Sequence, residues 1–354
     1  MKNKKGNLMH AKLGALCAVV AIWAIAIADT ARIAAKIIDD ETGRPVEGVS
    51  VIGSFRDDIG WRAWTESVKP DLDCQMSDRE GLCRMSGRTN CGDASFWVKS
   101  VPDGYYKAGG HCYRFKEKNL LGIWQPDNLV ATIRLQRVEH PIPLFVKRVG
   151  DHINRSKVGY VDGTNTLFKY DLVVGDYLPP DGRGKIADLV VESRLTSLFS
   201  TNLYLQTMVF YDFTNTMSFP GEGNGVVSSM TRATDGIKLR VAPVEGYERA
   251  AVSRCGNRMK VMPPNIWDDV YTECNPNRCH YFRIRSRYDE SGNLVGGYYG
   301  KIYGDFEIGC RLRYGGCSVE FLYYLNPAPL DRNLEWDRKT NLCPDPGNLG
   351  MRRP

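Results

Sequence analysis

Residues 36–55 read KIIDDETGRPVEGVSVIGSF, and this stretch decides the fold of the first half of the chain. Two apolar runs flank a segment of acidic residues, glycine and proline. Gly43 is expected to adopt a positive φ, because glycine has no Cβ to oppose it. Side-chain oxygens between Asp39 and Thr42 can accept hydrogen bonds from turn amides. The stretch therefore predicts two strands joined by a tight turn, a hairpin that closes the edge of a β-sandwich.

Similar strand-like runs follow along the whole chain, rich in Val, Ile and aromatic residues and bounded by turn residues. They cover residues 31–38, 48–55, 94–101, 128–138, 142–149, 166–174, 186–195, 202–213, 237–244, 280–288, 297–308 and 318–325. Helical periodicity is scarce: PNIWDDVYTE at 264–273, with Pro264 near its start, predicts a short helix, and GWRAWTESV at 60–68 is a weaker case. We expect an all-β protein built from antiparallel sheets.

A boundary between two domains is expected near residues 137–142. RVEHPIPLFV places Pro141 and Pro143 between two strand-like runs, and proline cannot donate to a sheet ladder. A chain of this length is also too long for one core. We therefore expect a β-sandwich over residues 29–137 and a larger antiparallel β-sandwich or jelly-roll-like domain over residues 138–354.

The first 28 residues have the features of a cleaved signal peptide. Lys2, Lys4, Lys5 and Lys12 form a basic head, residues 13–28 carry no charge, and Ala26-Ile27-Ala28 matches the small-residue cleavage pattern. The apolar run of 16 residues is short for a membrane span. We expect an exported protein, periplasmic, at the cell surface or secreted, whose mature chain has no membrane span. The alternative is an uncleaved N-terminal anchor.

Removal of that segment changes the charge of the protein. The formal net charge of +6 loses four lysines and becomes +2. The remaining sequence has no run of Lys and Arg that would form a clustered basic face. Nucleic acid is therefore not an expected partner.

Ten cysteines remain in the mature chain, and their distribution follows the domain boundary. Four lie before it and six after it, at Cys74, Cys83, Cys91, Cys112, Cys255, Cys274, Cys279, Cys310, Cys317 and Cys343. Even numbers in an exported protein predict disulfides closed within each domain. The alternative is a metal site at Cys274, Cys279 and His280, but zinc favours closer, repeated pairs, and no metal is expected.

The opening stretch also resembles a known family. D-x-x-T-G-x-P-V-x-G-V-x-V between two strands is similar to the start of the carboxypeptidase regulatory-like domain, a transthyretin-type β-sandwich. Ser77, Asp78 and Gly81 resemble its second turn, and SFWVKSVPDGYY its later strand. The resemblance covers residues 31–137, with an inserted segment at 56–73 and four cysteines that depart from the pattern. It implies a module that accompanies other domains, and no activity of its own.

Residues 138–354 resemble the C-terminal region of exported bacterial proteins that carry such a sandwich at their front. The similar stretches are FKYDLVVGDYLPPDGRGKIADLVVE, YYGKIYGDFEIG and EFLYYLNPAPLDRNLEWDRKTNL. That group has no assigned activity, so the resemblance implies an architecture without a mechanism.

The sequence contains none of the common catalytic motifs, neither G-x-S-x-G, H-E-x-x-H nor a phosphate-binding loop. Acidic residues that could hydrolyse a glycoside lie on expected strands at Asp171, Asp176, Asp188, Glu192, Asp305, Glu307 and Glu320. Asp305 and Glu307 are two residues apart and would share one face of an extended strand. No cofactor is expected, although a structural calcium ion held by loop carboxylates and carbonyls stays open. For an EF-hand pattern, DGTNTLFKYD at 162–171 offers only Asp162 and Asp171.

Aromatic residues point to a binding role. Tyr298, Tyr299 and Tyr303 lie beside Asp305 and Glu307 in GGYYGKIYGDFEIG, and exposed rings next to carboxylates can stack on sugars and bond their hydroxyls. The alternative is that these rings only fill a core.

We therefore predict a non-enzymatic exported protein that binds or organises structure at the cell surface or in the periplasm. Polysaccharide is the preferred ligand, and another cell-surface protein is the second candidate partner. The alternatives are an extracellular glycoside hydrolase that uses sheet-borne carboxylates, and a purely architectural module without a small ligand.

Overall fold

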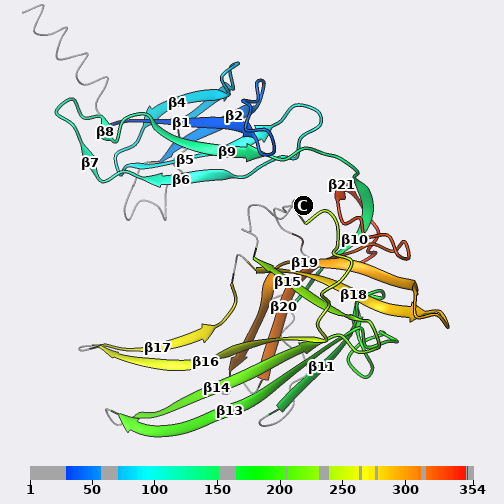
Figure 1. Ribbon diagram of the computed structural model, residues 1–354. Helices are drawn as coiled ribbons and strands as arrows, with labels where there is room; N and C mark the ends of the chain where they lie inside the picture. Colours follow the sequence, from blue (N-terminus) through cyan, green and yellow to red (C-terminus); the bar gives the residue numbers. More distant parts are fainter. Residues whose placement is uncertain are drawn as a thin grey trace, which may run out of the picture. The chain divides into compact units, whose positions relative to one another are not determined.

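The computed structural model of the chain describes residues 29–56, 71–150, 165–203, 206–230, 239–262, 265–275, 278–311, 316–347 and 349. Every regular element within these ranges is a β-strand (Figure 1), which confirms the all-β prediction. The same ranges contain no helix long and apolar enough to cross a membrane. The expected signal peptide and the helix expected at residues 60–68 lie outside the described residues.

The chain divides into two compact units, one ending at Glu139 and the other beginning at His140. The strands of the first unit are β1 (Thr30–Asp39), β2 (Ser50–Arg56), β3 (Asp71–Met76), β4 (Leu82–Arg88), β5 (Asp93–Ser100), β6 (Gly110–Arg114), β7 (Glu117–Lys118), β8 (Trp124–Gln125) and β9 (Leu129–Leu135). They form a sheet of order β4-β1-β9, a sheet of order β3-β2-β5-β6, and the pair β7-β8.

The two larger sheets of the first unit share one core and form a sandwich. Alternation along β1 buries Ile33 and Ile37, and β2 contributes Val51 and Phe55 from the other sheet. The central strand β1 is antiparallel to β4 and parallel to β9. The first strand of the unit is therefore held by its last.

The opening stretch connects these two sheets. Asp39 Oδ1 accepts hydrogen bonds from the amides of Glu41 (3.1 Å) and Thr42 (2.8 Å), and Gly43 has a φ of 67°, as the sequence predicted. The predicted hairpin is wrong, because β1 and β2 belong to different sheets. The turn folds back on the end of β1, where the Val46 amide bonds the Ile37 carbonyl, and the chain then crosses to the second sheet.

The described part of the second unit contains twelve strands. They are β10 (Ile142–Val149), β11 (Asn165–Asp171), β12 (Asp176–Tyr177), β13 (Leu189–Leu203), β14 (Gln206–Ser218), β15 (Gly225–Met230), β16 (Ala250–Met262), β17 (Asn265–Thr272), β18 (Arg278–Tyr288), β19 (Leu294–Arg311), β20 (Gly316–Leu325) and β21 (Trp336–Asn341). Two six-stranded sheets result, of orders β15-β18-β19-β20-β10-β21 and β12-β11-β13-β14-β16-β17.

The second unit is also a sandwich, with an aromatic core between its sheets. Phe168 and Tyr170 of β11 and Phe213 of β14 meet Phe282 of β18 and Tyr323 of β20 in one buried cluster. All strand pairs are antiparallel except β10 with β21. The helix predicted at residues 264–273 is wrong, because β17 there pairs with β16 across a short connection, Met262 opposite Asn265.

Candidate functional site

The tyrosines predicted to bind a ligand pack into three separate clusters. Tyr298 packs against the large core, Tyr299 is 3% exposed and lies with Ala242 and Leu334, and Tyr303 packs against the cluster around Trp336. Alternation along β19 sends Tyr298 to one face of the sheet and the other two to the opposite face. The three tyrosines therefore do not form one exposed face, and their role in ligand binding stays a prediction.

Asp305 and Glu307, which were predicted to share one face of the strand, differ in their exposure. The pairing of β19 with β20 shifts in register between Tyr303 and Glu307, and this irregularity breaks the alternation. Asp305 is buried and Glu307 is exposed.

Six of the seven carboxylates considered for glycoside hydrolysis have partners within the protein. Asp176 pairs with Arg183, Glu192 with Arg194 and Glu320 with Arg148. Asp171, Asp188 and Asp305 belong to the two clusters described next, and Glu307 is the exposed exception. The six partnered carboxylates, unlike Glu307, hold loops and strands of the unit in place.

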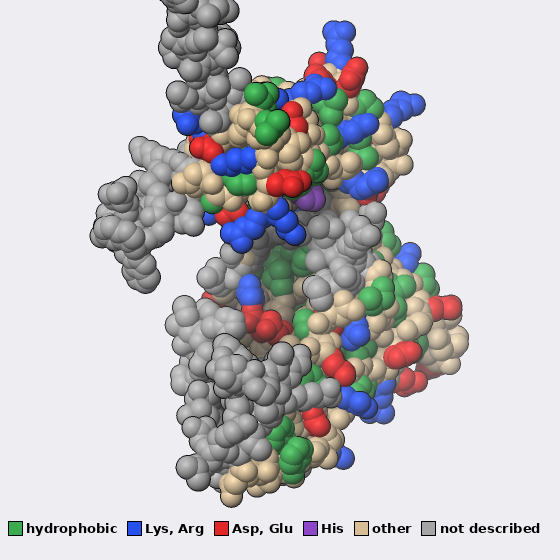
Figure 2. Space-filling view, turned by 90° about the vertical axis from the view of Figure 1, so that its left-hand side faces the viewer, with side chains coloured by type: hydrophobic (Ala, Val, Ile, Leu, Met, Phe, Trp, Pro, Cys, Tyr) green, Lys and Arg blue, Asp and Glu red, His purple; other side chains and the backbone are tan. Residues whose placement is uncertain are grey.

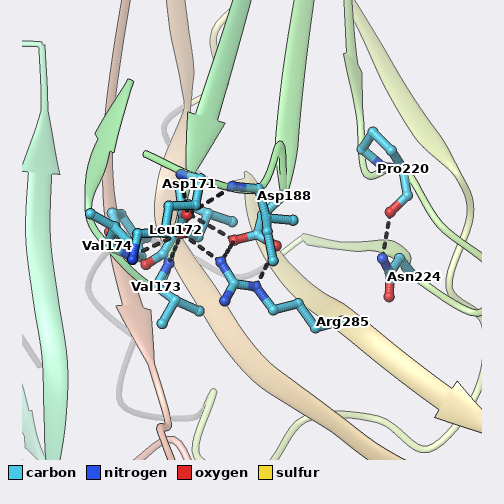
Figure 3. Close-up of polar contacts among 11 residues, drawn as sticks. Asp171, Leu172, Val173, Val174, Asp188, Pro220, Asn224 and Arg285 are labelled. Atoms are coloured by element: carbon cyan, nitrogen blue, oxygen red, sulfur yellow. Dashed lines mark hydrogen bonds and ion pairs between the residues drawn. The ribbon is translucent and has the colours of Figure 1, made fainter. Parts of the chain in front are cut away.

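The first buried cluster joins Asp171, Asp188 and Arg285 (Figure 3). The Arg285 guanidinium donates to Asp188 Oδ1 and Oδ2, both at 2.9 Å, and to Asp171 Oδ1 at 2.6 Å. Both aspartates are at most 1% exposed. Arg285 has a φ of 55° beside a register shift in β18. Because the backbone is irregular here, the Arg285 side chain can reach Asp171 and Asp188 although the adjacent Ile284 also faces the core.

Backbone amides complete this cluster. Asp171 also accepts hydrogen bonds from the amides of residues 173, 174, 185 and 186, and Asp188 accepts one from Leu172. Burial opposes ionisation of Asp171, but the amides and the charge of Arg285 outweigh it and lower its pKa. Burial dominates at Asp188 and raises its pKa. The cluster fixes the loop between β11 and β13, and Asp171, a residue of the calcium candidate, is already bound by protein groups.

The second cluster is a relay of three side chains from neighbouring strands, of which His280 and Asp305 are buried and Ser228 is exposed. Ser228 on β15 lies directly opposite His280 on β18, and Asp305 lies on β19. The serine Oγ is 3.0 Å from His280 Nδ1, and His280 Nε2 is 2.8 Å from Asp305 Oδ1. We call these three residues the serine relay. The sequence contains no motif that links these three residues, because they come together only through the pairing register of three strands.

Asp305 is a carboxylate in this arrangement. Its side chain is 1% exposed, and this burial raises the pKa, but the bond to His280, the Asn275 amide and the charge of Arg278 together lower it. The Asn275 and Phe306 amides donate at 3.0 and 2.9 Å, and both carboxylate oxygens therefore act as acceptors. A carboxylate has no proton to donate, so His280 Nε2 carries the hydrogen.

The cysteines near the relay are thiols. Burial, followed by the charges of Asp305 and Glu307, raises the pKa of Cys274 to about 11. Burial also raises the pKa of Cys279, whose Sγ accepts the amide of Gly304 at 3.4 Å. Among the described residues, no group of three acids, cysteines or histidines could hold a metal ion.

None of the predicted disulfides is seen among the cysteines whose side chains the structure describes. Eight cysteines have described side chains, and all carry thiols: Cys74, Cys83, Cys91, Cys112, Cys255, Cys274, Cys279 and Cys343. Several are committed to other contacts, since Cys255 Sγ accepts a hydrogen bond from Asn215 and Cys83 lies in the first core. Cys310 and Cys317 are backbone partners across β19 and β20, and their side chains lie outside the described part of the chain.

A buried lysine is a further feature that sequence reasoning missed. Lys301 is 1% exposed on β19, donates to the Leu239 carbonyl at 3.2 Å and lies 5.0 Å from the Tyr324 ring centroid. Burial lowers its pKa to about 7, although Cys279 and Glu335 oppose the shift. Nothing in the sequence singled out Lys301, because lysine is seldom found in a core.

The charges visible on the surface are mixed. On the face shown in Figure 2, basic side chains are interspersed with acidic ones and form no continuous stripe. This distribution agrees with the small net charge expected of the mature chain.

No family model matches the chain, and no curated protein matches it. Among solved structures it is similar to the C-terminal domain of the shaft pilin SpaA from Lactobacillus rhamnosus GG (16% identity, 31% of this chain and 98% of that chain, TM-score 0.21). It is also similar to the full-length major pilin SpaD from Corynebacterium diphtheriae (10% identity, 86% and 56%, TM-score 0.24). These similarities assign neither a family nor an activity to the chain.

Proposed function

We propose that the chain is an exported structural or binding module that acts at the cell surface or in the periplasm. The observation that carries this proposal is the use of its acidic side chains. Six of seven candidate carboxylates are bound by arginines, a histidine or backbone amides, and the most buried of them fix loops to a sandwich. In such a chain most of the candidate acidic side chains stabilise the fold through ion pairs and hydrogen bonds.

Export is tested by the mature N-terminus. Full-length protein should be expressed in a bacterial host, recovered from the periplasm or medium, and measured by intact mass. Cleavage after Ala28 should leave Asp29 as the first residue. Full-length protein confined to the cytoplasm would contradict the proposal.

Polysaccharide is the ligand class that we propose for the module. Exposed aromatic rings support it: Trp97 on β5 is 40% exposed, and Phe199 on β13 is 56% exposed. Phe199 stacks on Phe210 with centroids 4.5 Å apart and planes 5° from parallel, which presents flat apolar surface on a sheet. Flat rings of this kind can stack on the apolar faces of sugars.

A glycan array probed with the purified mature chain tests this ligand class. Binding should fall in Trp97→Ala or Phe199→Ala and persist in Leu198→Ala, because Leu198 is equally exposed at 56% but has no ring. An array with no bound glycan would reject polysaccharide and leave another cell-surface protein as the candidate partner. Equal losses in all three variants would contradict ring stacking.

A further inference from the structure

The serine relay joins an exposed hydroxyl to a buried base. His280 continues the core-facing row of β18, with Phe282 and Ile284, and is 1% exposed. On β15, Val226 on the same face is 2% exposed, whereas Ser228, two residues nearer the end of the strand, is exposed. β15 is an edge strand of its sheet. Ser228 is therefore an exposed residue at a sheet edge, whereas the imidazole to which it bonds is buried.

The hydrogen-bond directions follow from the ionised carboxylate. Asp305 accepts the Nε2 hydrogen of His280, so a neutral ring has its lone pair on Nδ1. Ser228 Oγ, 3.0 Å away, then donates its proton to Nδ1. The histidine is thus positioned to take the serine proton, and the aspartate fixes its tautomer and orientation.

The buried end of the relay is rigidly held. Asp305 receives two backbone amides and lies 3.4 Å from a terminal nitrogen of Arg278. The His280 ring packs against Phe306, with centroids 5.2 Å apart. These contacts hold the imidazole in place before any substrate arrives, which general-base catalysis requires.

We propose that Ser228 is a nucleophile toward carboxylic esters, with His280 as its general base and Asp305 as a positioning residue. This reactivity goes beyond the structural or binding role and does not depend on it. Serine hydrolases usually place the carboxylate at Nδ1 and the serine at Nε2. In this protein the ring is turned over, and Nδ1 serves as the base.

The reaction balances without a cofactor. Ser228 Oγ attacks the ester carbonyl carbon as its proton passes to His280 Nδ1, and the alcohol leaves with that proton. The acyl group is then bonded to Ser228 Oγ. Water, deprotonated by the same nitrogen, releases the carboxylic acid and restores the serine.

Covalent labelling of the intact protein tests the proposal. A fluorophosphonate probe should attach to Ser228 Oγ with loss of fluoride, and peptide mass mapping should place the adduct there. Ser228→Ala should abolish labelling, and Ser291→Ala, in an exposed turn between β18 and β19, should leave it unchanged. Likewise, the wild type and Ser291→Ala should hydrolyse p-nitrophenyl acetate, and Ser228→Ala should not.

The histidine is tested by His280→Gln, with near-UV circular dichroism to confirm the fold. Labelling of Ser228 should slow by about 100-fold or more, the usual contribution of a general base. An unlabelled wild-type protein, an adduct spread over several serines, or a folded His280→Gln protein that reacts at the wild-type rate would each overturn the proposal. If His280→Gln does not fold, the wild-type adduct map and the Ser228→Ala variant decide the question.

Discussion

Arg285 holds Asp188 through two parallel hydrogen bonds, from Nε to Oδ1 and from a terminal nitrogen to Oδ2, each 2.9 Å long. The same guanidinium reaches Asp171. One cation thus neutralises two buried acids of the opposite sheet's strands and loops, Asp171 at the end of β11 and Asp188 directly before β13. Loss of the cation would leave both carboxylates in the core.

Arg285→Met should lower the free energy of unfolding by about 3–5 kcal/mol, since it breaks a buried ion cluster from one side. Arg183→Ala is the matched control, because its pair with Asp176 is formed by a side chain that is 88% exposed; it should cost under about 1 kcal/mol. Urea denaturation measures both. Similar values for the two variants would show that the buried cluster contributes no more than a surface pair.

Asp39→Ala should destabilise the first unit by about 2–4 kcal/mol, because it leaves several donors without an acceptor. Asp39 is 1% exposed and, besides two turn amides, it accepts hydrogen bonds from Tyr105 at 2.9 Å and Arg137 at 2.6 Å. Glu47→Gln, at an exposed site nearby, should change stability little.

Asp39 should also contribute to acid sensitivity. Burial acts to raise its pKa, but the bonds from Arg137, Thr42 and Tyr105 prevail and lower it. A lowered pKa means that the contribution is complete above the unfolded-state value and is lost as pH falls through the folded one. The stability difference between wild type and Asp39→Ala should therefore shrink as the pH is lowered below about 4. A difference independent of pH would contradict this assignment.

Lys301→Met should stabilise the second unit near neutral pH and should remove part of its pH dependence. The folded-state pKa is about 7, against an ordinary value of 10.5, so the unfolded chain binds a proton that the folded protein does not. Wild-type stability therefore gains about 1.4 kcal/mol per pH unit from this group between those values. The advantage of the variant should be largest near pH 7 and should decline by pH 9.

Lys339→Met, at an exposed position on β21, is the control for this comparison. It should show the pH dependence of the wild type. Thermal or urea unfolding at pH 7, 8 and 9 gives the three curves. Parallel curves for wild type and Lys301→Met would mean that the amine is protonated in the fold.

Gly81→Ala should cost the first unit more than Gly43→Ala, although both glycines have a positive φ, 74° and 67°. At Gly43 a Cβ would meet nothing within 4 Å, and strain alone should cost about 1–2 kcal/mol. At Gly81 it would lie 2.3 Å from the Ile37 carbonyl oxygen, so backbone must move and the cost rises by a further 1–3 kcal/mol or so. Equal urea unfolding midpoints for Gly81→Ala and Gly43→Ala would contradict the steric conflict expected between a Cβ at residue 81 and the Ile37 carbonyl oxygen.

Strands could be predicted from the sequence where one face of the strand is buried. β10, β11, β18 and β20 all coincide with expected apolar or alternating runs, because their side chains face a core. β3 was missed, since DLDCQM is largely exposed and is held at the sheet edge by its backbone pairing with β2. Residues 239–244 form only an isolated bridge at Val241, despite an apolar pattern.

The polar clusters were much harder to predict than the sheets. Asp171 and Asp188 were candidate acids, but nothing in the sequence indicates that Arg285, 114 and 97 residues away from them, neutralises both. Ser228 and His280 meet because β15 and β18 pair in one register. Such contacts depend on long-range strand pairing, which local pattern does not encode.

The pairing of first strands with last strands has a consequence for biogenesis. β1 needs Leu129–Leu135 as its parallel neighbour, and β10 needs both β20 and β21. Neither sandwich can close until almost all of its residues have been synthesised, and most of the favourable contacts arrive late. The growing polypeptide of each unit therefore remains incompletely folded until its last strands have been synthesised.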